Sequence, residues 1–168
     1  GDIGDVKALS KVGDIRNSLF WGSDGLRSLA ARDFENNSIW LPGTVGKFTA
    51  TRDVFSNTGV SVGAMTSITV GRDFLGNFFE IAGLLGGMTV GGAFNSTLKF
   101  TGPTTAFLKS LTVAGDIFGT ISSAARIGTI ASKNGTIGAA IETRAEGPDG
   151  DLDSLSAGAD FIGTLTVG

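Results

Sequence analysis

The chain has 168 residues, with 13 basic and 16 acidic side chains and neither histidine nor cysteine. The absence of both residue types excludes disulfides, thiolate nucleophiles and the commonest ligands of transition metals. The weakly acidic balance argues against a nucleic-acid partner, because such proteins carry a basic face. No apolar stretch approaches the roughly 20 residues that a membrane helix needs, so we expect no membrane span.

Apolar residues recur along the chain in units that lie 19 to 25 residues apart. Around each of these positions apolar and polar residues alternate, as in Leu111-Thr112-Val113. Alternation with a period of two is typical of a strand that buries one face. Each unit therefore opens with a strand, and the opening residues are Leu9, Leu29, Phe48, Ile68, Met88, Leu111, Ile130 and Leu155.

A turn follows each of these strands, and an aspartate marks it in most units. Ala93 and Gly135 take its place in two units. We expect each aspartate to accept hydrogen bonds from backbone amides two residues further on and so to stabilise its own corner. Arg32, Arg52 and Arg72 should offset the stacked negative charge. The predicted corner residues are Asp14, Asp33, Asp53, Asp73, Asp116 and Asp160.

A second strand begins about ten residues after each opening residue, at positions such as Ile39 and Ile121. Aromatic side chains one place beyond this start should point outward, namely Phe20, Trp40 and Phe79. Exposed aromatic residues gathered on one face usually mark an interface. We expect this stripe to contact a glycan or a neighbouring rod.

About 20 residues per unit, two strands in each and glycine at the corners predict a parallel β-solenoid of about eight coils. Residues 1–168 then form one solenoid domain, with short insertions between coils at 101–107 and 146–151, where glycine and proline occur. A leucine-rich-repeat horseshoe is the alternative, because "LKSLTVAGD" fits its pattern with Asp in the Asn position. The second half of each unit, such as "FGTISS", is too short for a helix, which favours the solenoid.

Two further features concern ligands and modification. Asp149, Asp151 and Asp153 alternate in an acidic loop, a spacing that hard cations favour, and we expect at most weak calcium binding there and no other cofactor. Three acceptor sequences for N-glycosylation begin at Asn36, Asn95 and Asn134.

The threonines that follow the opening residues form a column, Thr49, Thr69, Thr89 and Thr112. Ice-binding solenoids need two such ranks. The rank that follows this column is mostly glycine, alanine or charge, so we interpret the threonines as a consequence of β-propensity.

The units "LTVAGDIFGTI" and "ITVGRDFLGNF" resemble the repeats of large secreted bacterial surface proteins with adhesin-like β-helical stalks. The resemblance implies an extracellular or cell-surface location and points to no active site. We interpret the chain as a structural module, not an enzyme, because its charged residues mostly occupy repeating positions. The alternative is a carbohydrate-binding or carbohydrate-active β-helix protein of the pectin-lyase type.

The repeat begins within the first residues and is still present in the last, "FIGTLTVG". Uncovered end coils of a solenoid recruit further strands. We therefore expect copies of the chain to associate end to end, through residues 6–19 and 155–167, into a filament, surface layer or adhesin stalk.

Overall fold

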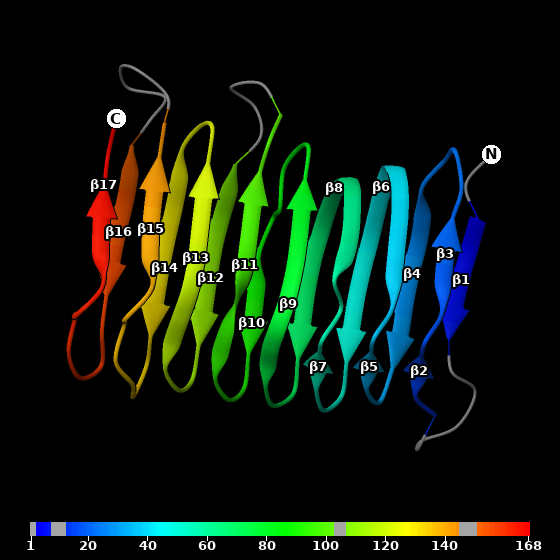
Figure 1. Cartoon of the computed structure of the whole chain (residues 1–168), viewed down its shortest axis with the longest axis horizontal. Helices are drawn as coiled ribbons and strands as arrows, with labels where there is room; N and C mark the ends of the chain where they lie inside the picture. Colours follow the sequence, from blue (N-terminus) through cyan, green and yellow to red (C-terminus); the bar gives the residue numbers. More distant parts are fainter. Residues whose placement is uncertain (1–2, 8–12, 103–106, 145–150) are drawn as a thin grey trace.

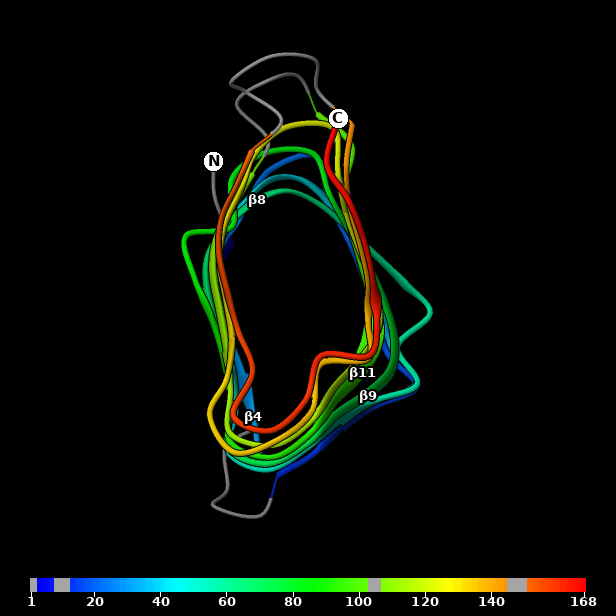
Figure 2. The same ribbon diagram turned by 90° about the vertical axis from the view of Figure 1, so that its left-hand side faces the viewer.

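The computed structural model describes residues 3–7, 13–102, 107–144 and 151–168. The chain folds into a parallel β-solenoid of about 7 turns, roughly 20 residues apart, with 63% of its residues in strands. The coils stack along the long axis of the molecule (Figure 1), and they superimpose in a flattened closed outline when seen along that axis (Figure 2). The predicted solenoid is confirmed, and the horseshoe alternative is wrong because the described part of the chain contains no helix.

The strands lie on two faces and one corner. The first face contains β1 (Ile3–Lys7), β4 (Leu26–Ala31), β10 (Met88–Val90), β12 (Leu108–Val113), β14 (Ile127–Ser132) and β16 (Leu152–Ser156). The second face contains β3 (Leu19–Trp21), β9 (Phe74–Ile81), β11 (Phe94–Phe100), β13 (Ile117–Ser123), β15 (Ala140–Thr143) and β17 (Thr164–Thr166). The longer strands β6 (Ser38–Ala50) and β8 (Gly59–Val70) bend from the second face to the first. Short strands at the corner are β2 (Ile15–Arg16), β5 (Phe34–Glu35) and β7 (Val54–Phe55).

Strands of successive coils pair in parallel and in register, so that Leu29 lies opposite Phe48 and Phe48 opposite Ile68. Because side chains alternate along a strand, this register places equivalent residues of every coil in one column. The predicted opening residues from Leu29 to Ile130 form one such column and are all buried. The two faces share a single core between them.

Phenylalanines fill the core of the central coils. Phe34 packs on Phe48 with ring centroids 4.4 Å apart, and Phe74 stacks on Phe94 at 5.5 Å with nearly parallel rings. From β13 onward isoleucine takes over, as at Ile117, which lies opposite Phe94 in the same column. The core is therefore one continuous set of columns whose composition changes along the rod.

A ladder of buried amide side chains runs along the corner before the second face. The Nδ2 of Asn37 donates to Oδ1 of Asn57 at 3.0 Å, and Asn57 donates in the same way to Asn77 at 2.9 Å. Asn77 then donates to the Oγ of Ser96 at 3.3 Å. The same oxygens also accept backbone N–H groups, from Asn37 to Asn57 at 2.9 Å and from Asn57 to Asn77 at 3.0 Å. The amides thus satisfy backbone donors where the chain turns between strands.

The residue before each amide of this ladder has a positive φ. The angle is 53° at Asn36, 56° at Ser56 and 64° at Gly76. These left-handed residues make the bend that aims the amide inward, and glycine or asparagine adopts such a conformation with little strain. Because β9 and β11 go out of register between Asn95 and Thr97, the number of residues in this corner differs from coil to coil.

We predict that Asn57→Ala lowers the free energy of unfolding by roughly 3 kcal/mol, because it leaves the backbone N–H of Asn37 buried without its acceptor and removes a rung of the ladder. Thr58→Ala, at the exposed next residue, should change it by less than about 0.5 kcal/mol. Urea unfolding followed by circular dichroism measures both. Equal effects of the two substitutions would show that the ladder contributes nothing.

Candidate functional site

The predicted aspartate corner is a structural device that links one coil to the next. The Oδ1 of Asp33 accepts the backbone N–H of Asp53 at 3.1 Å, and Asp53 accepts that of Asp73 at 3.1 Å. The Oδ1 of Asp73 accepts the N–H of Ala93 at 2.8 Å, and Asp116 accepts that of Thr136 at 2.8 Å. The expected partner, an amide two residues further on, is wrong for these four aspartates.

The remaining two aspartates of the column lie in the end coils. Asp14 accepts two hydrogen bonds from Arg32, at 2.9 and 2.8 Å. Asp160 is exposed, and its backbone carbonyl accepts the N–H of Ile137 at 2.8 Å.

Arginines reach back across the coils to these carboxylates, as the sequence predicted. Arg72 binds Asp53 through two nitrogens, at 3.1 and 2.6 Å. Arg52 lies between Asp33 at 3.7 Å and Asp53 at 3.6 Å. Asp33 and Asp53 therefore each hold a guanidinium group and a backbone amide.

The charged side chains at the aspartate corner shift one another's pKa values. Partial burial raises the pKa of Asp53, but hydrogen bonds from Arg72 and from the Asp73 amide outweigh it and hold that pKa below its ordinary value. The pKa of Asp14 is lowered in the same way, since Arg32 outweighs the effect of desolvation. The hydrogen bond to Asp53 in turn raises the pKa of Arg72.

The aromatic stripe differs from the prediction in two of its three members. Trp40 is 47% exposed on the second face, as expected. Phe79 is fully buried and packs edge-on against Phe48 and Phe74, and Phe20 is half-buried against the core. The prediction assumes that the second strand always begins ten residues after the opening residue. The coil of β9 has one more residue in its corner than the next coil, and this shift by one residue turns Phe79 to the inward side.

Trp21, which the sequence prediction missed, is the true neighbour of Trp40. The two residues lie opposite each other on β3 and β6, with ring centroids 6.1 Å apart and planes 13° from parallel. Trp21 is 71% exposed, and Leu19 beside it is exposed too. The column that begins with this pair continues through Ser61, Glu80, Lys99, Ser122, Glu142 and Thr166.

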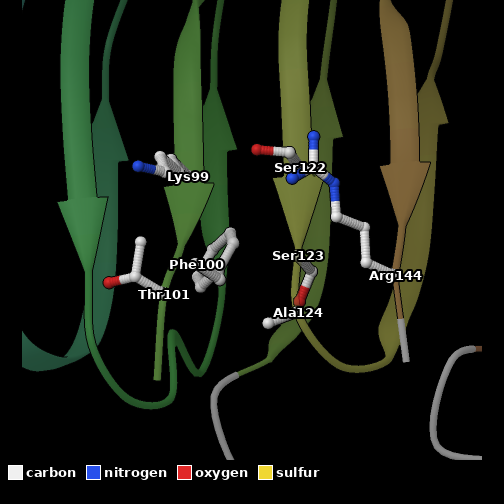
Figure 3. A pocket seen from close by; sticks show the side chains of 7 residues that line it. All are labelled: Lys99, Phe100, Thr101, Ser122, Ser123, Ala124 and Arg144. Atoms are coloured by element: carbon white, nitrogen blue, oxygen red, sulfur yellow. The ribbon is translucent and has the colours of Figure 1, made fainter. Parts of the chain in front are cut away.

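A hollow of about 220 Å³ opens further along the same column. Its lining consists of Lys99, Phe100, Thr101, Ser122, Ser123, Ala124 and Arg144 (Figure 3). The hollow exists because β13 and the residue after it carry the small side chains Ser122, Ser123 and Ala124 between coils that carry larger ones. Two cations and three hydroxyl groups thus surround a shallow space on a chain of net charge -3.

Carboxylates beside the hollow hold its two cations. Arg144 donates to both oxygens of Glu142, at 2.9 and 3.1 Å, and Lys99 lies 3.8 Å from Glu80. The hydrogen bonds from Arg144 lower the pKa of Glu142 and raise that of Arg144. Thr101 also donates to Glu80, at 3.3 Å.

The threonine column on the first face is in register, with Thr49 opposite Thr69 and Thr89 opposite Thr112. The rank on its other side is interrupted by Lys47 and Gly87. This face therefore lacks a second regular rank of hydroxyl groups.

The calcium prediction remains a prediction. Asp149 lies outside the described residues, and Asp153 accepts a hydrogen bond from Arg126 at 2.8 Å, which engages one of the three carboxylates. Within the described ranges no three acidic side chains are grouped so that they could hold a metal ion. The three predicted glycosylation acceptors, Asn36, Asn95 and Asn134, are all exposed.

Comparison of the chain with protein-family models, curated proteins and solved structures gives no match. In the described part of the chain, no helix is long and apolar enough to cross a membrane.

We predict that Arg72→Gln destabilises the protein slightly at pH 7, because Asp53 loses its solvent-exposed ion pair. The stability that a lowered folded-state pKa provides is present above the unfolded-state pKa of about 3.9 and is lost as the pH falls through the folded-state value. The difference between variant and parent should therefore shrink towards pH 2. Urea unfolding at both pH values tests this, with Arg27→Gln, an exposed arginine of β4, as control. A difference that is independent of pH would refute the role of Asp53.

Proposed function

We propose that this protein is a structural rod module whose coils stack end to end with those of a second copy. The observation that carries the proposal is the uncovered core at the C-terminal coil. Phe161 continues the buried column of Ile117 and Ile137 but is 43% exposed, because it belongs to the last coil that the structure describes. Leu165 continues the column of Ile141 and is 44% exposed for the same reason.

This end offers both apolar surface and backbone hydrogen-bonding groups. The last strands, β16 and β17, pair with β14 and β15 of the preceding coil and lie at one tip of the rod (Figure 1). A coil added beyond them would extend the parallel register that holds every other coil. Phe161 and Leu165 are already more than half buried, so covering the rest of each contributes roughly 1 kcal/mol, less than half of the value for a fully exposed side chain, in addition to the strand pairing.

The opposite tip supplies a matching surface. β1 begins the stack and pairs with β4 in the same parallel register. Ile15 and Phe20 of the first coil are half-buried against the core; residues 8–12 of the predicted contact lie outside the described residues. A contact between two different ends does not close on itself, so it propagates into a filament. An extracellular filament, surface layer or adhesin stalk is the setting that the repeat resemblance suggests.

A carbohydrate-active enzyme of the pectin-lyase type is less well supported. Glu80 and Glu142 share one column but stand three coils apart, which is about 14 Å at the spacing of parallel strands. Pairs of catalytic carboxylates in glycosidases lie within about 5–9.5 Å of each other. Each of the two glutamates is also held by a cation. Glu146, a further candidate acid, lies outside the described residues.

We predict that the 168-residue chain forms concentration-dependent oligomers above micromolar concentration, and that Phe161→Lys with Leu165→Lys abolishes them, since two charges would have to be buried at the junction. Sedimentation velocity and electron microscopy measure the length of the rods.

Ile162→Lys serves as the matched control. Ile162 is the most exposed apolar residue of the same coil and, as the neighbour of Phe161, points away from the stacking surface. It should leave association unchanged. A monomeric parent chain at concentrations well above micromolar would contradict the proposal.

A further inference from the structure

The second face carries two features that the proposed end-to-end contact does not use. One is the tryptophan pair, Trp21 and Trp40, and the other is the hollow lined by Lys99 and Arg144. Both belong to one outward column, because Trp40, Glu80 and Lys99 follow one another in register along the rod. A ligand that lies along the rod axis would therefore meet both.

The hollow has the size and the donors to bind one sugar ring. A volume of about 220 Å³ corresponds to about seven waters at roughly 30 Å³ each, which exceeds the volume of a simple inorganic anion. The hydroxyl of Thr101 donates to Glu80, and Phe100 is almost fully buried beneath the hollow (Figure 3). Ser122 presents a hydroxyl group at the edge of the hollow, and Ala124 contributes exposed apolar surface. Sugar rings need this combination, since they expose hydroxyl groups at the edge and C–H groups on their faces.

The charges of the hollow favour an anionic ligand. Among the described residues that line it, two are cations and none is acidic. Glu80 and Glu142 stand beside the hollow and hold the cations without lining it. Arg144 reaches towards Ser122, whereas the ammonium group of Lys99 points away from both and would turn inward on binding (Figure 3). A guanidinium and an ammonium group are suited to bind a carboxylate or a sulfate.

The spacing of the column suits an extended polymer. Successive coils lie about 4.8 Å apart, which is close to the rise of one pyranose unit in an extended polysaccharide. Lys99 stands three coils from Trp40, or about 14 Å along the axis. An aromatic ring is a stacking surface for the C–H face of a sugar. Trp40 is exposed at that distance, and Trp21 is exposed one coil further along, about 19 Å from Lys99.

We propose that this column is a binding strip for an extended acidic polysaccharide. An anionic pyranose, carboxylated or sulfated, occupies the hollow between Lys99 and Arg144, and sugars further along the chain contact Trp40 and Trp21. The strip lies on the side of the rod, so it is independent of contacts at the ends.

Binding of defined oligosaccharides to the 168-residue chain tests this proposal. Calorimetric titrations use hexamers and dimers of galacturonate, a sulfated galactan hexamer and the neutral cellohexaose. Both tryptophans of the chain lie in the strip, so their fluorescence reports directly on its occupation. We expect the galacturonate hexamer, the sulfated hexamer or both to bind at least tenfold more tightly than cellohexaose, with an affinity that falls as salt is raised.

Four variants separate the parts of the strip. Lys99→Gln with Arg144→Gln should weaken binding of the acidic hexamer at least tenfold, whereas Arg126→Gln, which removes an exposed arginine paired with Asp153, should not. Ser122→Leu should block the hollow without changing any charge. Trp40→Ala should weaken the hexamer and leave the dimer unaffected, because a dimer in the hollow cannot reach Trp40. Unchanged circular dichroism checks that each variant is folded.

Several results would overturn the proposal. These are equal affinity for neutral and acidic hexamers, binding of poly-glutamate or inorganic sulfate as tight as that of the acidic hexamers, an equal loss in the Arg126→Gln variant, and absence of binding. None of the four variants changes a residue of the terminal coils, so all four should associate end to end as the parent chain does. Sedimentation of the same variants therefore distinguishes failure of polysaccharide binding from failure of end-to-end association.

Discussion

Hydrogen bonds between equivalent residues of successive coils hold the other features of this protein in place. In the strands these bonds are the parallel backbone pairs, as between Leu29 and Phe48. At the corners side chains provide them, through carboxylates such as Asp53 and amides such as Asn57. Wherever the chain turns, backbone N–H and C=O groups lose their partners in the neighbouring strand. Each of these groups that is buried needs another hydrogen-bond partner. Because these hydrogen bonds join equivalent residues, they keep successive coils in register and hold equivalent side chains in columns.

The columns explain why functional surfaces form on this chain at all. A single exposed tryptophan or lysine has little binding capacity, but the register sets Trp21 against Trp40 and places Lys99 in line with both. The hollow beside Lys99 is likewise a consequence of register, because one coil carries small side chains where its neighbours carry large ones. A difference in side-chain size between successive repeats therefore produces a hollow on the surface of the solenoid.

The sequence predicted the coil, its strands and the buried opening residues, because a period of two within a period of about 20 leaves few other folds. It failed in the corners. There the number of residues varies between coils, and a left-handed residue such as Ser56 or Gly76 adds to the count without a clear hydrophobic signal. Phe79 was therefore placed outside and Trp21 missed. The amide ladder did leave a signal, since Asn37, Asn57 and Asn77 recur at intervals of 20, but asparagine is so common in turns that this recurrence looked ordinary.

The corner ladders also show that the two halves of the rod are held by different means. The amide ladder runs from Asn37 to Ser96, over the coils whose core is rich in phenylalanine. The ladder ends there because Gly119, which lies opposite Ser96 in the next coil, carries no side chain. At the other turn, after the first face, Ser132 donates to the Gly115 carbonyl at 2.7 Å and accepts the Gly135 amide at 2.9 Å.

Gly135 is required at that turn, because a Cβ atom there would lie 2.4 Å from the carboxylate of Asp116. The register places Thr136, and not Gly135, in the column of carboxylates, because Ile117 lies opposite Ile137 and Asp116 accepts the backbone N–H of Thr136. The prediction that Gly135 takes the place of an aspartate is therefore wrong by one residue. Thr136 interrupts the column of carboxylates, and its backbone N–H still donates to Asp116 of the preceding coil, so the hydrogen bond between the two coils is kept.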